Sequence, residues 1–287
     1  MQNDFTAISF CTIFFYVNCT LIRIFIYPVC TIDMLTKNQA KKIRSLGIKK
    51  YRERYGEFIA EGDKIIKELI NSNLQINSIY ATPTWIEKNK NFLSSHLTIV
   101  SLTPSQLKNI SQQTTPNQAL ALVNIPQQKQ IPDPQNKVTL LIENIQDPGN
   151  LGTIIRTAEW FGINNIICSG DTVDLYNPKV IQATMGSFCR INIFYTNIIN
   201  YLNMHKNKVP VYGAVLNGQN AFKQKFQKNA ILVVGNESKG ISVEVENFIT
   251  HKVTIPPYDS DNELKPDSLN ASVAAAILMS LFRMNTD

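Results

Sequence analysis

Apolar and polar positions follow two periods in turn along the chain beyond residue 137. Short apolar runs that suit buried strands occur at 138–144, 165–170, 191–195, 209–215, 230–236 and 252–256. Helical patterns occupy 151–162, 178–188 and 268–284. Nearly continuous apolar strands separated by helices predict a parallel sheet covered on both faces, so residues 138–287 are expected to form an α/β domain.

A smaller unit precedes this domain, over residues 34–125. Apolar runs at 58–60, 79–82, 98–102 and 119–126 alternate with helical patterns at 64–70 and 104–110. Thr103, directly before Pro104, is expected to cap the second helix. The pattern predicts a compact α/β domain. Residues 126–137, PQQKQIPDPQNK, contain three prolines and little to bury, and are predicted to link the two domains.

The first 33 residues differ from the rest. Residues 5–29 are rich in Phe, Ile, Tyr, Cys and Thr with one charge, Arg23, so their length would suit a membrane span. The acidic opening MQND and the lack of a small-residue cleavage site argue against a signal peptide. The preferred interpretation is that translation starts at Met34 and that residues 1–33 are a mis-assigned extension. A membrane anchor is the alternative. The start at Met34 is preferred because everything from Leu35 onward reads as an ordinary cytoplasmic protein.

The chain carries 28 Lys and Arg against 22 Asp and Glu, a net charge of +6 that is compatible with a polyanionic partner. Within a short stretch, 37–54, one acid, Glu53, interrupts eight basic residues: Lys37, Lys41, Lys42, Arg44, Lys49, Lys50, Arg52 and Arg54. Tyr51 and Tyr55 interleave these charges and could stack on bases. An RNA phosphate surface and a solvated helix face are equally good interpretations of the stretch.

Cysteine and histidine usage points away from disulfides and metals. The five cysteines have neither CxxC spacing nor the density of a disulfide framework. The three histidines lie apart from cysteines and acidic pairs, so no metal site is predicted.

In a parallel α/β sheet, ligands bind at the carboxyl ends of strands, and the loop after 138–144 is the first of three that stand out. It reads IENIQDPGNLGTIIRTAE. Asn150 suits the cap of a helix that begins at Leu151, which is a sufficient structural reason for it. Arg156 is harder to explain, because a base near a helix start is disfavoured by the helix dipole.

The second loop reads VVGNESKGIS. Gly235 and Gly240 have the spacing of a nucleotide-binding phosphate loop, but Ile241 replaces its lysine and excludes that function. What remains is a strand that ends in a glycine-bracketed loop with Glu237 at its tip. A tight turn with a solvated glutamate is the structural alternative.

The third loop precedes the helix at 268–284. Ser268 suits the helix cap, which leaves Asn270 without a capping role. No GxGxxG follows any strand, so a dinucleotide dehydrogenase is unsupported, and no Ser-His-Asp or Cys-His arrangement is evident.

In this order, NIQDPGNLGTIIRTAEWFG, LVVGNESKGIS and IPPY…SLNASVAAAILMSLF resemble the three motifs of the SpoU (TrmH-like) RNA 2′-O-ribose methyltransferases of the SPOUT class. The resemblance runs from Met34 to the C-terminus, and residues 34–125 are similar to the family's small substrate-binding domain. It implies a C-terminal SPOUT domain with a deep trefoil knot, S-adenosyl-L-methionine as cofactor, and a homodimer with its site at the subunit interface.

The resemblance also implies roles for individual residues. The positions that match catalytic residues of the family are Asn150, Arg156, Glu237, Ser268 and Asn270. Gly235, Ile255 and Leu269 fall where members hold the cofactor. Arg156 would act as the general base or as an electrostatic clamp. The loop at 258–267 is longer than the family's usual one, which puts some cofactor contacts there in doubt.

Ribosomal RNA is the expected substrate, because the extra N-terminal domain is commoner in that branch of the family. Transfer RNA is the second choice. A non-catalytic RNA-binding protein on the same scaffold is the alternative from another functional class.

Overall fold

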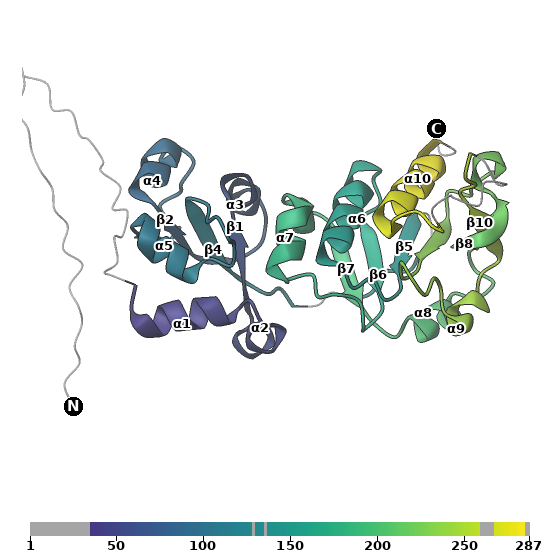
Figure 1. Ribbon diagram of the computed structural model, residues 1–287, viewed down its shortest axis with the longest axis horizontal. Helices are drawn as coiled ribbons and strands as arrows, with labels where there is room; N and C mark the ends of the chain where they lie inside the picture. Colours follow the sequence, from purple (N-terminus) through teal and green to yellow (C-terminus); the bar gives the residue numbers. More distant parts are fainter. Residues whose placement is uncertain (1–34, 128–129, 135–136, 259–266, 285–287) are drawn as a thin grey trace, which may run out of the picture.

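The computed structural model describes residues 35–127, 130–134, 137–258 and 267–284. The predicted leader, with the proposed start at Met34, and most of the acidic loop at 258–267 lie outside these residues. The described chain forms two sheets, one of four strands and one of six, each with its own helices (Figure 1). Among the described residues, no helix has the length and apolarity needed to cross a membrane.

The N-terminal domain is built on a mixed sheet with the strand order β1-β4-β2-β3, in which β4 runs antiparallel to both its neighbours. The strands are β1 (Glu57–Glu61), β2 (Ile76–Ala81), β3 (Ile99–Ser101) and β4 (Ala119–Asn124). The helices are α1 (Lys37–Ser45), α2 (Lys49–Tyr55), α3 (Asp63–Ile70), α4 (Pro83–Asn89) and α5 (Pro104–Ile110). Thr103 caps α5 as predicted, in a reciprocal pair of hydrogen bonds with Gln106.

The C-terminal domain confirms the predicted parallel sheet, with the strand order β10-β8-β9-β5-β6-β7. Its strands are β5 (Val138–Ile142), β6 (Asn165–Cys168), β7 (Asn192–Tyr195), β8 (Val211–Asn220), β9 (Ala230–Val234) and β10 (His251–Thr254). Its helices are α6 (Pro148–Trp160), α7 (Pro178–Thr184), α8 (Ile198–Met204), α9 (Val243–Glu246) and α10 (Ala271–Met284). Two short 3-10 turns cover Ser187–Cys189 and Ala221–Lys223. The trefoil knot stays a prediction.

Both faces of this sheet are covered, because successive side chains of a strand point to opposite sides. In β5, Leu140 and Ile142 join the core beneath α6, α7 and α10, whereas Leu141 joins a second core beneath α8 and α9. Helices α6 and α10 lie side by side on the first face (Figure 1).

The helix predicted at 178–188 is shorter than expected. It ends at Thr184 because Met185 and Gly186 take the left-handed backbone conformation, with φ of 52° and 101°. A Cβ on Gly186 would lie 2.6 Å from Cγ of Glu68 on α3, so the N-terminal domain approaches the chain closely there. The sequence pattern could not predict this contact, because it joins residues that are far apart in the chain.

The two domains share one continuous hydrophobic core. Phe58 of β1 packs against Tyr176 and Phe188 of the C-terminal domain, with ring centroids 4.7 and 5.9 Å away. Arg190 adds ion pairs to Glu68 of the first domain and Glu159 of the second. The described residues of the predicted linker, 126–137, contain neither helix nor strand. These contacts fix the N-terminal domain against α7, as Figure 1 shows.

Strand β8 leaves its neighbour for part of its length. Lys252 of β10 pairs with Gly213, but the next residue, Val253, pairs with Gln219. The chain between these partners bends out of the ladder and returns at Gly218, where a Cβ would lie 2.6 Å from the backbone of Val253. This excursion supplies one wall of the pocket described next.

Candidate active site

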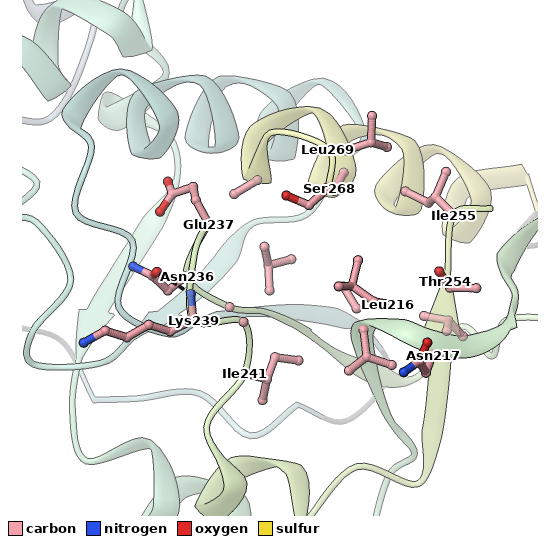
Figure 2. Close-up of a pocket in the computed structure, with 18 of the residues that line it drawn as sticks. Leu216, Asn217, Asn236, Glu237, Lys239, Ile241, Thr254, Ile255, Ser268 and Leu269 are labelled. Atoms are coloured by element: carbon pink, nitrogen blue, oxygen red, sulfur yellow. Dashed lines mark hydrogen bonds between the residues drawn. The ribbon is translucent and has the colours of Figure 1, made fainter. Parts of the chain in front are cut away.

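A pocket of about 790 Å³ opens where β9 and β10 end (Figure 2). Its walls are residues 214–217, 234–241, 252–255 and 267–269, together with the first turns of α10. Its volume falls in the range of about 300 to 1,000 Å³ that is usual for small-molecule sites. Ligand sites of parallel α/β folds are expected at this carboxyl edge.

The loop after β9 is a tight turn that returns on itself. The backbones of Asn236 and Gly240 exchange two hydrogen bonds of 3.0 Å, and Gly240 has a φ of 68°. A Cβ on Gly235 would lie 2.4 Å from the carbonyl oxygen of Gly240, so only glycine fits there. The side chain of Asn236 donates to the carbonyl of Asn144, 2.8 Å away, which ties the turn to the loop after β5. The turn therefore presents Glu237 from a fixed backbone.

Helix α6 begins earlier than predicted, at Pro148. Its cap is Asp147, whose carboxylate accepts from the backbone N–H of Asn150 at 2.8 Å. The prediction that Asn150 caps this helix is therefore wrong. Because Asn150 is the third residue of the helix, its side chain is available for other bonds, and its Nδ2 donates to Oε1 of Glu237 at 2.7 Å.

Helix α10 begins later than predicted, at Ala271. Asn270 occupies the cap position, since its Oδ1 accepts from the backbone N–H of Ser272 at 2.9 Å and its carbonyl accepts from Ala274. The predictions that Ser268 caps the helix and that Asn270 has no capping role are both wrong. Ser268 lies on the pocket wall instead.

One chain of hydrogen bonds joins all three sequence motifs. Nδ2 of Asn270 donates to Oδ1 of Asn150 at 3.0 Å, and Asn150 donates in turn to Glu237. Each amide is fixed in orientation, because its oxygen accepts on one side while its nitrogen donates on the other. A half-buried carboxylate at the pocket rim is thereby held ready to accept from an amine or hydroxyl of a ligand.

Arg156 does not join this group within the chain. It lies in the third turn of α6, on the exposed face that also carries Thr153 and Trp160, and Trp160 is 83% exposed. Arg156 forms no hydrogen bond or ion pair with another residue of the described segments. The structure thus brings together Asn150, Glu237 and Asn270, with Ser268 on the same pocket, and leaves Arg156 on the outer surface.

The three residues predicted to hold a cofactor, Gly235, Ile255 and Leu269, all line the pocket. Sequence reasoning missed Leu216 and Ile241, which lie around the same space in Figure 2. These side chains offer an apolar wall to a flat ring, while the surrounding backbone offers hydrogen-bonding groups. Leu216 could have been suspected from the glycines at 213 and 218 that bracket the excursion of β8.

Most basic side chains of the 37–54 stretch are exposed, and some of them form ion pairs within the protein. Those exposed are Lys37, Lys41, Arg44, Lys49, Lys50 and Arg54. Lys49 lies 3.9 Å from Glu53, and half-buried Lys42 pairs with Glu57. The ring of Tyr55 stacks on Tyr51 at a centroid distance of 6.4 Å.

Arg52 is the exception, since it is only 2% exposed. Its guanidinium donates to Oδ2 of Asp174 at 2.7 Å and to the carbonyl of Leu46 at 2.8 Å. Arg52 therefore fits neither interpretation of the basic stretch, RNA surface or solvated face, because this buried side chain fastens the N-terminal domain to the C-terminal one.

No cluster of three or more His, Cys, Asp or Glu side chains that could hold a metal ion occurs among the residues the structure describes.

The fold and the site define an α/β protein with a small-molecule pocket at the carboxyl edge of a parallel sheet and a second domain docked beside it. Residues 137–280 match the SpoU rRNA Methylase family, and residues 37–121 match the MRM3-like substrate binding domain. The chain belongs to the SpoU rRNA Methylase family.

The chain is similar to known proteins over both domains. The 23S rRNA (guanosine(2553)-2′-O)-methyltransferase RlmP of Bacillus subtilis is 30% identical over 85% of this chain and 95% of its own length. A putative RNA methyltransferase of the TrmH family from Porphyromonas gingivalis has 36% identity and a TM-score of 0.78, covering 88% of this chain and 99% of that one. The AdoMet-bound rRNA methyltransferase from Sinorhizobium meliloti has 26% identity and a TM-score of 0.76, covering 88% and 97%.

Proposed function

We propose that this protein transfers a methyl group from S-adenosyl-L-methionine to a ribose 2′-hydroxyl of ribosomal RNA. The observation that carries the proposal is the hydrogen-bonded chain of Asn270, Asn150 and Glu237 at the rim of the pocket. Its support from relatives is that RlmP, similar over both domains, is named as a 2′-O-methyltransferase of 23S rRNA.

The pocket fits the proposed cofactor in size and in the chemistry of its walls. Leu216, Ile241 and Ile255 would enclose the adenine ring, and the turn at Gly235 would bring backbone groups close to the ligand. When bound, S-adenosylmethionine supplies an electrophilic methyl group on a sulfonium. The S. meliloti relative was solved with AdoMet bound.

Each proposed catalytic side chain has a separate task. Glu237, oriented by Asn150, accepts a hydrogen bond from a polar group near the reacting atoms, and Ser268 borders the same space. Arg156 acts on the ribose or its phosphate. The electrostatic role is favoured, because arginine is too weak a base in proteins to take a proton readily.

A homodimer would bring Arg156 to a second subunit's pocket. Helix α6 exposes Trp160 by 83%, helix α10 exposes Val273 and Met284 by 46 and 74%, and Leu269, just before α10, is 47% exposed. Together with Arg156 they make one outward surface, which we propose as the subunit interface. Exposed apolar residues on neighbouring helices are a usual mark of an interaction site.

The RNA surface is proposed to be the exposed basic residues of the N-terminal domain: Lys41, Arg44, Lys49, Lys50 and Arg54, with Lys42 beside them. Positive charge on one domain would attract the RNA backbone, while the pocket of the other domain carries out the transfer. Residues 37–121 also match a domain named for substrate binding.

The test is tritium transfer from labelled S-adenosylmethionine to 23S rRNA transcripts, followed by digestion and identification of the labelled nucleoside. The proposal expects a 2′-O-methylated nucleoside from wild-type protein. Arg156→Ala should bind the cofactor normally by calorimetry yet transfer at least about 100-fold more slowly, the loss typical for one charge-stabilising group. Transfer only to tRNA would replace the substrate, and failure to bind the cofactor would point to a non-catalytic RNA-binding protein.

The dimer has its own test in sedimentation or light scattering. Wild-type protein should have twice the mass of a single chain, and Trp160→Lys combined with Val273→Lys should reduce it to the mass of one chain. A monomeric wild type, or a double variant that stays dimeric, would contradict this interface.

A further inference from the structure

A second cavity, of about 370 Å³, lies between the two domains. Ile59, Glu61 and residues 112–114 form one wall, and the first two turns of α7, from Pro178 to Ala183, form the other. Because each domain supplies only one wall, this junction cavity exists only when the domains are docked. Its volume falls within the usual range of about 300 to 1,000 Å³ for ligand sites.

The two walls are joined by amide side chains. Nε2 of Gln113 donates to Oε1 of Gln182 at 2.9 Å, across the domain boundary. Oε1 of Gln113 accepts from Nδ2 of Asn117 at 2.7 Å, which fixes the orientation of the first amide. The junction cavity therefore has a defined shape.

Glu61 contributes an acceptor to the junction cavity. Its side chain accepts from the hydroxyl of Ser111 at 2.6 Å and from the backbone N–H of Gln112 at 2.8 Å. Burial raises the pKa of this carboxyl, with the residue 5% exposed. Each carboxylate oxygen has a second lone pair, so Glu61 can still accept from a ligand. At the rim, exposed Lys179 supplies a positive charge.

The junction cavity lies close to the candidate active site. A Cβ on Gly152 of α6 would be 2.4 Å from Cβ of Ala183, a residue that lines the cavity. Gly152 is two positions beyond Asn150, and both helices start at the carboxyl edge of the sheet. Helix α7, which lines the junction cavity, thus packs directly against helix α6, which carries Asn150 of the candidate active site.

We propose that the junction cavity binds one unpaired nucleobase of the RNA, adjacent to the nucleotide that is methylated. The inference rests on the proposed function. Glu61 accepts from an amino or imino group of the base edge, and Lys179 pairs with the neighbouring phosphate. Guanine suits the cavity best, because its Watson–Crick edge carries adjacent N–H donors. Single-stranded bases are commonly recognised in this way.

Photo-crosslinking tests the location directly. The full-length protein is irradiated with 23S rRNA transcripts that contain 4-thiouridine or 6-thioguanosine, and crosslinked peptides are identified by mass spectrometry. The proposal expects crosslinks within 112–114 or 178–183, strongest with 6-thioguanosine. Crosslinks found only elsewhere on the protein would overturn it.

Kinetics separate the junction cavity from the catalytic pocket. Thr114→Phe, which fills the cavity from an exposed position, and Lys179→Ala should each raise the KM for RNA about tenfold, the loss expected for one base or phosphate contact, while kcat and cofactor affinity stay unchanged. The matched control, Lys88→Ala on the outer helix α4, should change none of these.

Unchanged KM values in both cavity variants would refute the proposal. Crosslinks in the junction cavity without methyl transfer would leave this inference standing while the proposed function fails. Methyl transfer without such crosslinks would support the proposed function and refute this inference.

Discussion

Asn150 receives a hydrogen bond from Asn270 and gives one to Glu237, so its side chain joins three segments that are distant in the sequence. The sequence suggested a simpler use, as a helix cap. Asp147 caps the helix instead. Because Asn150 is not needed as the cap, its side-chain amide is available to the site.

Replacing Asn150 with alanine should slow methyl transfer by about 10- to 100-fold, because a hydrogen bond to a charged group contributes roughly 1.5 to 3 kcal/mol. Cofactor affinity should change far less, since Asn150 is not part of the pocket wall. Single-turnover rates and calorimetry measure the two effects. Asn203→Ala, an exposed asparagine on α8, is the control and should leave both unaltered. A normal rate in Asn150→Ala would refute its positioning role.

Gly235→Ala should weaken S-adenosylmethionine binding by about 5- to 150-fold, because overpacking a fixed site costs roughly 1 to 3 kcal/mol. The new Cβ would meet the Gly240 carbonyl and push the turn out of place. Gly170→Ala is the matched comparison, since a Cβ there meets nothing within 4 Å. Calorimetry should find its affinity normal. Equal affinities for the two variants would mean that the turn does not shape the pocket.

Helix α2 carries two arginines of opposite character. Arg52 is buried against Asp174, whereas Arg54 is exposed, although both belong to the same basic run. Arg52→Met should lower the free energy of unfolding by about 3 kcal/mol, because it leaves a partly buried carboxylate without its partner. Arg54→Ala should stay within about 0.5 kcal/mol of wild type and should instead weaken RNA binding.

Urea unfolding and RNA binding by fluorescence anisotropy separate these effects. The assignment would be wrong if Arg52→Met were as stable as Arg54→Ala, or if Arg54→Ala bound RNA as tightly as wild type.

The regular elements of the C-terminal domain were accessible from sequence because its strands are almost wholly apolar. Nearly continuous apolar runs such as 138–144 and 230–236 are typical of strands that are buried on both faces of a parallel sheet. Helix ends were less accessible. Asp147 and Asn150, or Ser268 and Asn270, are equally good caps by residue type, and only the folded neighbours decide between them. The short helix α8 was not predicted either, because its seven residues give a weak period and, unlike α5, no proline marks its start.

For the candidate site, the sequence predicted which residues meet better than it predicted how they are arranged. Motif resemblance placed Asn150, Glu237 and Asn270 together, and the structure confirms their contact. It could not foresee that Arg156 points outward or that Arg52 is buried. Both depend on packing between surfaces, which no local pattern encodes.

The docking of the two domains should depend on pH through Glu159. Burial acts to raise its pKa, but hydrogen bonds from Arg190 and Ser187 outweigh this and lower the pKa below the ordinary 4.5. A lowered carboxyl pKa adds stability above pH 4.5, and this stability is lost as the pH falls through the lowered value. Arg190 also contacts Glu68, so the effect reaches the domain junction.

Thermal unfolding of wild type and Glu159→Gln between pH 7 and pH 3 measures this contribution. Wild type should be the more stable near neutrality, and the difference should shrink as the pH falls below 4.5. A difference that stays constant over this range would contradict the assigned role of Glu159.

At the scale of the whole molecule, the central proposal is that the two domains, the pocket and the dimer together methylate ribose hydroxyls of ribosomal RNA. Mapping 2′-O-methyl positions in total RNA, from cells with and without this gene, tests that claim most directly. One or a few ribosomal positions should lose their methyl group in the deletion, regain it with the wild-type gene, and remain unmethylated with Arg156→Ala. An unchanged ribosomal methylation map would contradict the account.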